Sequence, residues 1–161
     1  MQLSLDNPDL LEVHFTKVHK LDEIEDLLPK HKHTTEKGKE LCEHLHHKYL
    51  ISIDGWSSDV WRLPMILKSS SVPIVVESEH TPLYFDAWVP WTHYVPVKKD
   101  LSDLIENLMW LHNYDKKAKK IAENGSALFD ALYTPENMLT DAASVFIKYR
   151  ELMKYEPERP D

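Results

Sequence analysis

Short apolar segments alternate along the chain with longer segments in which apolar residues recur every three or four positions. The first pattern is typical of buried strands and the second of amphipathic helices. The three predicted strands are residues 48–53, 72–77 and 94–97. The helices predicted between and directly after these strands are residues 61–68, 83–88 and 101–111. Strands that alternate with helices in this order indicate an α/β fold with a small parallel sheet flanked by helices.

Several residues predict where individual helices begin and end. Asp100, followed three positions later by Asp103, has the capping-box arrangement and predicts the start of the helix over 101–111. Asn124-Gly125 is a pair that commonly ends a helix, and it therefore predicts a break. The two helices expected on either side of this break are residues 115–123 and 126–133.

The last helix is predicted from its first turn. Thr134 provides an N-cap and Pro135 occupies the first helical position, a placement that proline favours. The pattern continues to about Lys154. We expect the apolar stripes of the helices, together with Trp88 and Trp110, to form the core.

One domain is the default for a chain of 161 residues without an internal repeat. Residues 1–34 are predicted to be an irregular lead-in with a short helix at 21–28. Residues 35–155 are predicted to form the α/β domain, which opens with a helix that ends near residue 47, and residues 156–161 form a charged tail.

The composition argues against several functional classes. The chain has 19 basic and 27 acidic side chains, a formal charge of −8, which argues against binding of nucleic acid. No stretch of about 18 apolar residues predicts a membrane span, and residues 1–20 lack the apolar segment of a signal peptide. The single cysteine, Cys42, excludes an internal disulfide and a cysteine-based zinc site. With three glycines, the chain has neither the dinucleotide fingerprint nor the P-loop.

Polar residues follow the first two predicted strands. In the turn 54–62, Gly55 allows close approach of a ligand, Ser57 and Ser58 offer hydroxyls, and Arg62 offers a guanidinium that fits two phosphate oxygens. An anion site is one interpretation, although the negative charge of Asp59 counts against it. The other interpretation is an ordinary turn with Arg62 on the helix surface.

Residues near the other two strands extend this hypothesis. Glu77 and Ser78 end the second strand, where a carboxylate could accept hydrogen bonds from sugar hydroxyls, or could simply be solvated. His93 and Tyr94 precede the third strand, and we expect them near the other two strand ends. A histidine between aromatic residues is more often a packed, hydrogen-bonded residue than a catalyst.

A group of histidines suggests a metal site as an alternative. No carboxylate completes a helical ligand set with them, so no metal site is predicted. These histidines are His31, His33, His44, His46 and His47.

Blocks of sequence in a fixed order resemble glycosyltransferase family 90, the group of Rumi-like protein O-glucosyltransferases and fungal capsule xylosyltransferases. The resemblance extends over about residues 5–154, and its most specific block is Pro-Trp-x-His-Tyr-Val-Pro at 90–96. The other blocks that carry it are residues 7–11, 15–17, 48–55, 62–64, 100–104 and 121–125.

The resemblance implies a fold and an activity. Family members have two facing Rossmann-like domains, the GT-B arrangement, and transfer glucose or xylose from a UDP-sugar to an acceptor hydroxyl with inversion. They need no obligatory metal or other cofactor. This chain resembles the second domain, which holds the donor, so UDP-glucose or UDP-xylose and an acceptor protein or glycan are the implied partners. The family's acceptor domain and its carboxylate base precede residue 1 of this sequence, so we expect transfer to require an N-terminal half, which a separate chain could supply.

The resemblance also assigns roles to residues. Arg62 is the implied catalytic residue, because a guanidinium offsets the charge that develops on the departing UDP. The implied donor-binding residues are Asp54, Gly55, Trp56, Ser57, Ser58, Arg62, Glu77, Ser78, Trp91, His93 and Tyr94. An alternative function is a non-catalytic remnant of the fold that serves as an interaction module, suggested by the acidic, helical C-terminal region. Members that modify secreted proteins act in the secretory lumen, and the sequence leaves the compartment of this chain open.

Overall fold

A computed structural model describes residues 6–7, 9–11, 41–54 and 62–153 of the chain. The predicted helix at 21–28 and the charged tail at 156–161 lie outside these ranges. The described elements, in chain order, are α3 (Leu41–His44), β1 (Tyr49–Ser52), α4 (Arg62–Lys68), β2 (Val72–Val76), the 3-10 turn η2 (Phe85–Ala87), β3 (Val95–Val97), α5 (Leu104–Asn113), α6 (Asp115–Leu132) and α7 (Pro135–Leu152). The predicted α/β class is confirmed, and each predicted strand is present. The helix predicted over 83–88 is only the short turn η2.

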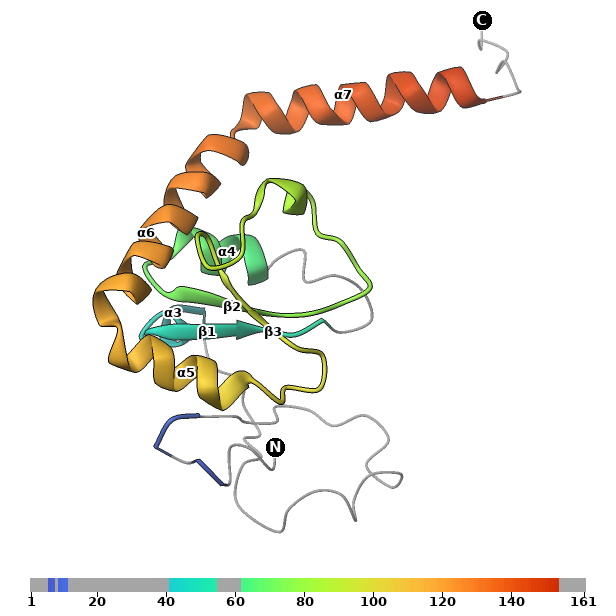
Figure 1. Ribbon diagram of the computed structural model, residues 1–161. Coiled ribbons are helices and arrows are strands. Elements are labelled where there is room, and N and C mark those ends of the chain that lie inside the picture. Colours follow the sequence, from blue (N-terminus) through green and yellow to red (C-terminus); the bar gives the residue numbers. More distant parts are fainter. Residues whose placement is uncertain (1–5, 8, 12–40, 55–61, 154–161) are drawn as a thin grey trace, which may run out of the picture.

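The three strands form one parallel sheet in the order β1-β2-β3 (Figure 1). The register pairs Ser52 with Val75 and Val76 with Val97, so the three strands end nearly level with one another. Parallel strands place all their carboxyl ends at one edge of a sheet. The residues that follow the strands therefore lie side by side at this edge.

Each face of the sheet has its own core. Successive side chains of β2 point to opposite faces of the sheet. On one face, Val72, Ile74 and Val76 pack against α5 and the first half of α6. Val75 faces the opposite way, toward α4 and the second half of α6. Because both faces are covered, β2 is a nearly continuous apolar run, as expected for a buried parallel strand.

Helix α6 links the two cores through Gly125. The predicted break at Asn124-Gly125 is wrong, because one continuous helix runs from Asp115 to Leu132. Gly125 is buried, and a Cβ atom there would lie 3.0 Å from the backbone oxygen of His93 and 3.0 Å from Cδ1 of Leu67. The glycine lets α6 pass close to its neighbours, and does not end the helix.

The start of α5 also differs from the prediction. The helix begins at Leu104, and neither Asp100 nor Asp103 caps it in the predicted way. Asp100 Oδ1 instead accepts a hydrogen bond from the Ser102 backbone at 3.0 Å, and Asp103 Oδ1 accepts one from the Lys98 backbone at 3.0 Å. The two carboxylates therefore stabilise a turn between β3 and α5, which is a common role for aspartate outside helices.

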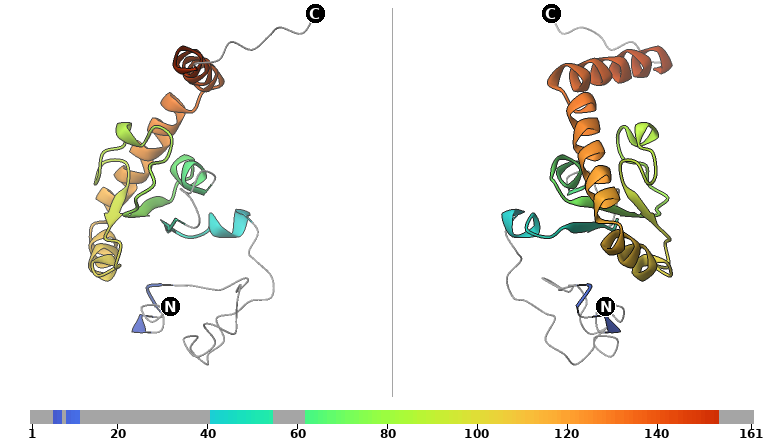
Figure 2. Two further views of the ribbon diagram at one scale, coloured as in Figure 1. Left: turned by 90° about the vertical axis from the view of Figure 1, so that its right-hand side faces the viewer. Right: turned by 60° about the vertical axis from the view of Figure 1, so that its left-hand side comes forward.

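Helix α7 extends away from the sheet, as Figures 1 and 2 show. Its N-cap is the predicted one: Thr134 accepts a hydrogen bond from the Asn137 backbone, and Pro135 is the first helical residue. The prediction that its apolar stripe belongs to the core is wrong for the described chain, because no residue of α7 is buried. Its exposed apolar residues include Met138, Leu139, Val145, Phe146, Ile147, Tyr149 and Leu152. Of the two tryptophans expected in the core, Trp88 is buried and Trp110 is partly buried.

Candidate functional site

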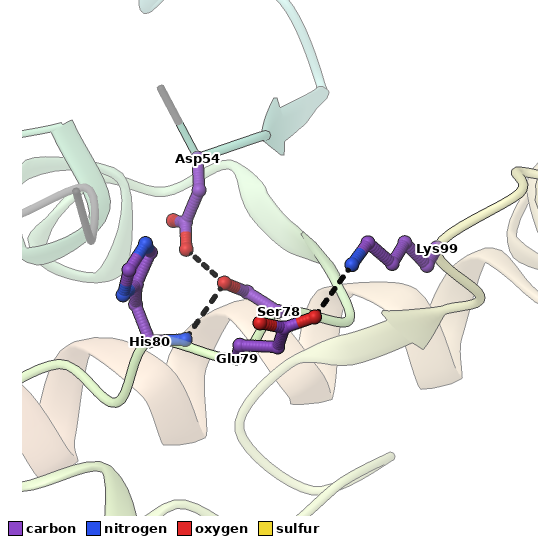
Figure 3. A network of polar contacts seen from close by, with 5 residues as sticks. All are labelled: Asp54, Ser78, Glu79, His80 and Lys99. Atoms are coloured by element: carbon purple, nitrogen blue, oxygen red, sulfur yellow. Dashed lines mark hydrogen bonds and ion pairs between the residues drawn. The ribbon is translucent and has the colours of Figure 1, made fainter. Parts of the chain in front are cut away.

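Polar side chains meet at the carboxyl edge of the sheet. Asp54 follows β1, and its Oδ2 accepts a hydrogen bond from the hydroxyl of Ser78, which follows β2 (Figure 3). Glu77 extends the hydrogen-bond ladder between β2 and β3 by one residue, because its backbone N–H donates a hydrogen bond to the Val97 carbonyl oxygen at 2.8 Å. The structure thus brings Asp54, Glu77 and Ser78 together, as the sequence predicted.

The same edge holds charged residues that the sequence reasoning missed. The Lys99 ammonium pairs with Glu79 Oε1 at 3.0 Å, and the His80 backbone donates to the Ser78 hydroxyl at 3.0 Å (Figure 3). The hydrogen bond from Lys99 lowers the pKa of Glu79. Lys98-Lys99 directly follows β3, so the rule that identified Asp54 would have found them too.

Arg62 begins α4, the helix that follows β1 along the chain. Its neighbour Leu63 is 2% exposed and anchors the first turn of α4 in the core, whereas Arg62 itself is exposed. The other predicted site residues of the turn 54–62 lie outside the described ranges, as does Asp59: these residues are Gly55, Trp56, Ser57 and Ser58.

Trp91 and His93 lie at the opposite edge of the sheet. Both precede β3, and the bridge between Pro90 and Tyr94 continues the chain on the amino side of that strand. In a parallel sheet a residue that precedes a strand lies away from the carboxyl ends, so the expected proximity to the other two strand ends is wrong for His93. Trp91, which the resemblance implies to be a donor-binding residue, lies on the same amino side of β3.

His93 stabilises the turn that contains it. Its Nδ1 accepts a hydrogen bond from the Val89 backbone at 2.9 Å, and burial lowers its pKa. The ring is therefore neutral near pH 7 and carries its proton on Nε2. This geometry agrees with the interpretation of His93 as a packed, hydrogen-bonded residue.

Tyr94 lies directly before β3, and its ring belongs to the aromatic core. Its backbone lies at the amino end of β3, and its ring is 7% exposed and packs against Trp88 and Phe85 with ring centroids 6.1 and 5.5 Å away. Burial, and to a lesser degree the negative charge of Glu77, raises the pKa of Tyr94. The phenol belongs to the aromatic core.

The histidines do not form a cluster in the part of the chain that the structure describes. Among residues 41–54 and 62–153, no three side chains of the metal-binding kinds gather around one point. His31 and His33 lie outside the described ranges. Within the same ranges, no helix is both long and apolar enough to cross a membrane.

Comparison with known proteins identifies one family. Residues 1–161 match the family described as Glycosyl transferase family 90. Human protein O-glucosyltransferase 3 is 32% identical over 161 residues, which cover 100% of this chain and 31% of the human protein. Zebrafish (Danio rerio) protein O-glucosyltransferase 2 is 33% identical over 71% of this chain and 23% of its own length. Rat (Rattus norvegicus) protein O-glucosyltransferase 1 is 31% identical over 91% of this chain and 38% of its own length. The chain therefore spans less than two fifths of these curated relatives.

Proposed function

The chain belongs to glycosyl transferase family 90, and we propose that it supplies the donor-binding part of a glycosyltransferase that moves a glucose unit from UDP-glucose to a hydroxyl of a protein. UDP-xylose is the alternative donor. The observation that carries the proposal is the convergence of Asp54, Glu77 and Ser78 at the carboxyl edge of a parallel sheet. Ligands of open α/β sheets bind at this edge. The names of the relatives support glucose and a protein acceptor.

The chemistry of the edge suits a nucleoside diphosphate sugar. The carboxylates of Asp54 and Glu77 can accept hydrogen bonds from the hydroxyls of ribose or of the sugar. The guanidinium of Arg62 can donate two parallel hydrogen bonds to phosphate oxygens. This interaction strengthens in the transition state, because the bond between the sugar and UDP breaks and negative charge develops on the departing diphosphate.

The remaining parts of the reaction follow from the proposed roles. A base takes the proton of the acceptor hydroxyl, whose oxygen attacks the anomeric carbon from the face opposite UDP, so the configuration inverts. In the proposal this base belongs to the acceptor-binding half of the complete protein. Arg62 offsets the charge of the leaving group, so donor binding requires no metal ion.

Isothermal titration of UDP into the chain tests the role of Arg62. Loss of a charge-assisted hydrogen bond costs about 1.5–3 kcal/mol, so we expect Arg62→Ala to weaken UDP binding about 10- to 100-fold. Arg150→Ala, which removes a guanidinium from the exposed helix α7, is the matched control and should bind UDP like the unchanged chain. Equal affinity of all three proteins would remove Arg62 from the site.

An interaction module without catalysis is the second candidate function. The exposed apolar face of α7 favours it, because single helices in soluble domains normally bury such a face. A thermal shift assay with UDP-glucose and UDP-xylose at millimolar concentration separates the two candidates. A higher melting temperature with either sugar nucleotide supports donor binding, and no change with both supports the interaction module.

A further inference from the structure

A second concave surface lies between the turn at residues 90–92, α5 and the first half of α6. It has a volume of about 590 Å³, and we call it the tryptophan hollow after Trp91 and Trp110. Small-molecule sites have volumes of about 300–1,000 Å³. The hollow opens near the amino end of β3, and Figure 1 shows the junction of α5 and α6 on the side away from the strand arrowheads. It is therefore at the opposite edge of the sheet from Asp54 and Ser78.

Two indole rings form a corner of the hollow. The rings of Trp91 and Trp110 meet edge to face, with centroids 5.1 Å apart and planes 74° apart. Trp91 is 43% exposed, although tryptophan is usually well buried. Its backbone has a φ of 60°, and its N–H donates to the Tyr94 carbonyl at 2.7 Å. A tight turn in a rarely populated conformation thus holds a large apolar ring in contact with solvent, an arrangement often found at binding sites.

Polar groups surround the two rings. Asn107 and Asn124 each donate one amide N–H to backbone carbonyls of the segment around β3, at 3.1 Å in both cases. These bonds fix the two amides, and within the described residues neither side-chain oxygen accepts a hydrogen bond. The Lys117 ammonium lies 5.6 Å from the centre of the Trp110 ring, and Glu106 lines the same hollow. The hollow therefore offers two apolar ring surfaces, several acceptors and a cation.

This combination matches the chemistry of a pyranose ring. Such a sugar has a patch of polarised C–H groups, which are attracted to the negative face of an aromatic ring. It also has a rim of hydroxyls that both donate and accept hydrogen bonds, so amide oxygens, a carboxylate and an ammonium are all suitable partners. We propose that the tryptophan hollow binds a pyranose unit of a carbohydrate, at a second site beyond the proposed donor site.

The proposal gives a role to Trp91, which belongs to the most distinctive block of the sequence but lies away from Asp54 and Ser78. It does not depend on UDP binding, because its residues come from α5, α6 and the turn at residues 90–92. A protein that attaches sugars could use such a site to hold a glycan that the acceptor already carries.

Nuclear magnetic resonance of the tryptophan indole N–H groups tests the proposal on the full chain. The probes are cellobiose and xylobiose, with glycerol as a polyol that lacks a pyranose ring. We expect each disaccharide to cause saturable shifts of the Trp91 and Trp110 signals, with a Kd of about 1 mM or weaker, since an open site makes few contacts. Glycerol should cause none. Signals that do not move with either disaccharide would overturn the proposal.

Variants distinguish this hollow from other sites. Trp91→Ala should weaken disaccharide binding at least tenfold, and Lys117→Gln, which leaves the aromatic rings intact, should weaken it several-fold. Phe146→Ala, an exposed aromatic residue of α7, is the matched control and should bind normally. Unchanged affinity in both Trp91→Ala and Lys117→Gln, or displacement of the disaccharide by UDP, would contradict the proposal. UDP titrated into the same samples keeps the two hypotheses separate, because Trp91→Ala should retain UDP binding whether or not cellobiose binds.

Discussion

Replacing Gly125 with alanine tests the packing of α6 against the sheet. In a solvent-exposed helix this change would stabilise the protein by about 1 kcal/mol, because alanine has the higher helix propensity. In α6 the new methyl group would lie 3.0 Å from the carbonyl oxygen of His93 and 3.0 Å from Leu67 Cδ1. Leu67 is fully buried, so any shift of its side chain would disturb the surrounding core. Overpacking of a core costs about 1–3 kcal/mol, so the net result should be a destabilisation of up to about 2 kcal/mol.

Urea unfolding followed by circular dichroism measures this change. The control is Ala127→Gly, which reverses the propensity change two residues further along α6 at an exposed position and should cost about 1 kcal/mol. Adding Leu67→Ala to Gly125→Ala should remove one of the two close contacts, so the double variant should be more stable than the sum of the single changes predicts. A Gly125→Ala chain that is more stable than the unchanged chain by about 1 kcal/mol would refute the reasoning.

Three further predictions concern the turn at His93, α7 and metal ions. Because burial lowers the pKa of His93, the stability it contributes is present above its ordinary pKa of about 6.5 and is lost as the pH falls through the lower folded value. His93→Asn keeps a hydrogen-bond acceptor but does not titrate, so its urea midpoint should fall less between pH 7.5 and pH 5 than that of the unchanged chain. An equal fall in the two proteins would contradict this role of His93. Phe146→Ser should change the free energy of unfolding by less than about 0.5 kcal/mol, because the ring is 72% exposed, and a loss above about 2 kcal/mol would show that α7 is packed. Excess EDTA should leave UDP affinity unchanged, whereas loss of binding that Mg²⁺ or Mn²⁺ restores would contradict metal-independent donor binding.

The sheet could be predicted from the sequence because its signals are local. Residues 48–53, 72–77 and 94–97 are short apolar runs between polar turns, a pattern and length typical of buried parallel strands. The proximity of Asp54 and Ser78 followed from the same reasoning, since the carboxyl ends of neighbouring parallel strands lie together, whereas their hydrogen bond was not predicted.

The errors arose where distant contacts decide the outcome. Asn124-Gly125 resembles a helix end, but the close approach of His93 and Leu67 explains the glycine inside a continuous helix. The apolar stripe of α7 resembles a core face, yet no described residue covers it. Local periodicity cannot report which neighbour, if any, packs against a helix.

The misplaced edge of Trp91 and His93 is a different kind of error. Topology alone gives the correct answer, because both residues precede β3 and must lie opposite the carboxyl ends of the sheet. They were assigned to the site at the carboxyl edge of the sheet, although they lie at its amino edge. The tryptophan hollow could not be found from sequence, because it depends on how α5 and α6 meet the turn around Trp91.

Backbone amide shifts on addition of UDP test the central claim most directly. If the carboxyl edge of the sheet holds the nucleotide, the largest shifts should occur at Asp54, Arg62, Glu77 and Ser78, and signals from α7 should not move. The Arg62→Ala chain should show smaller shifts at the same residues. Shifts centred on α7 or on the amino edge around Trp91, or no shifts at saturating UDP, would contradict the account.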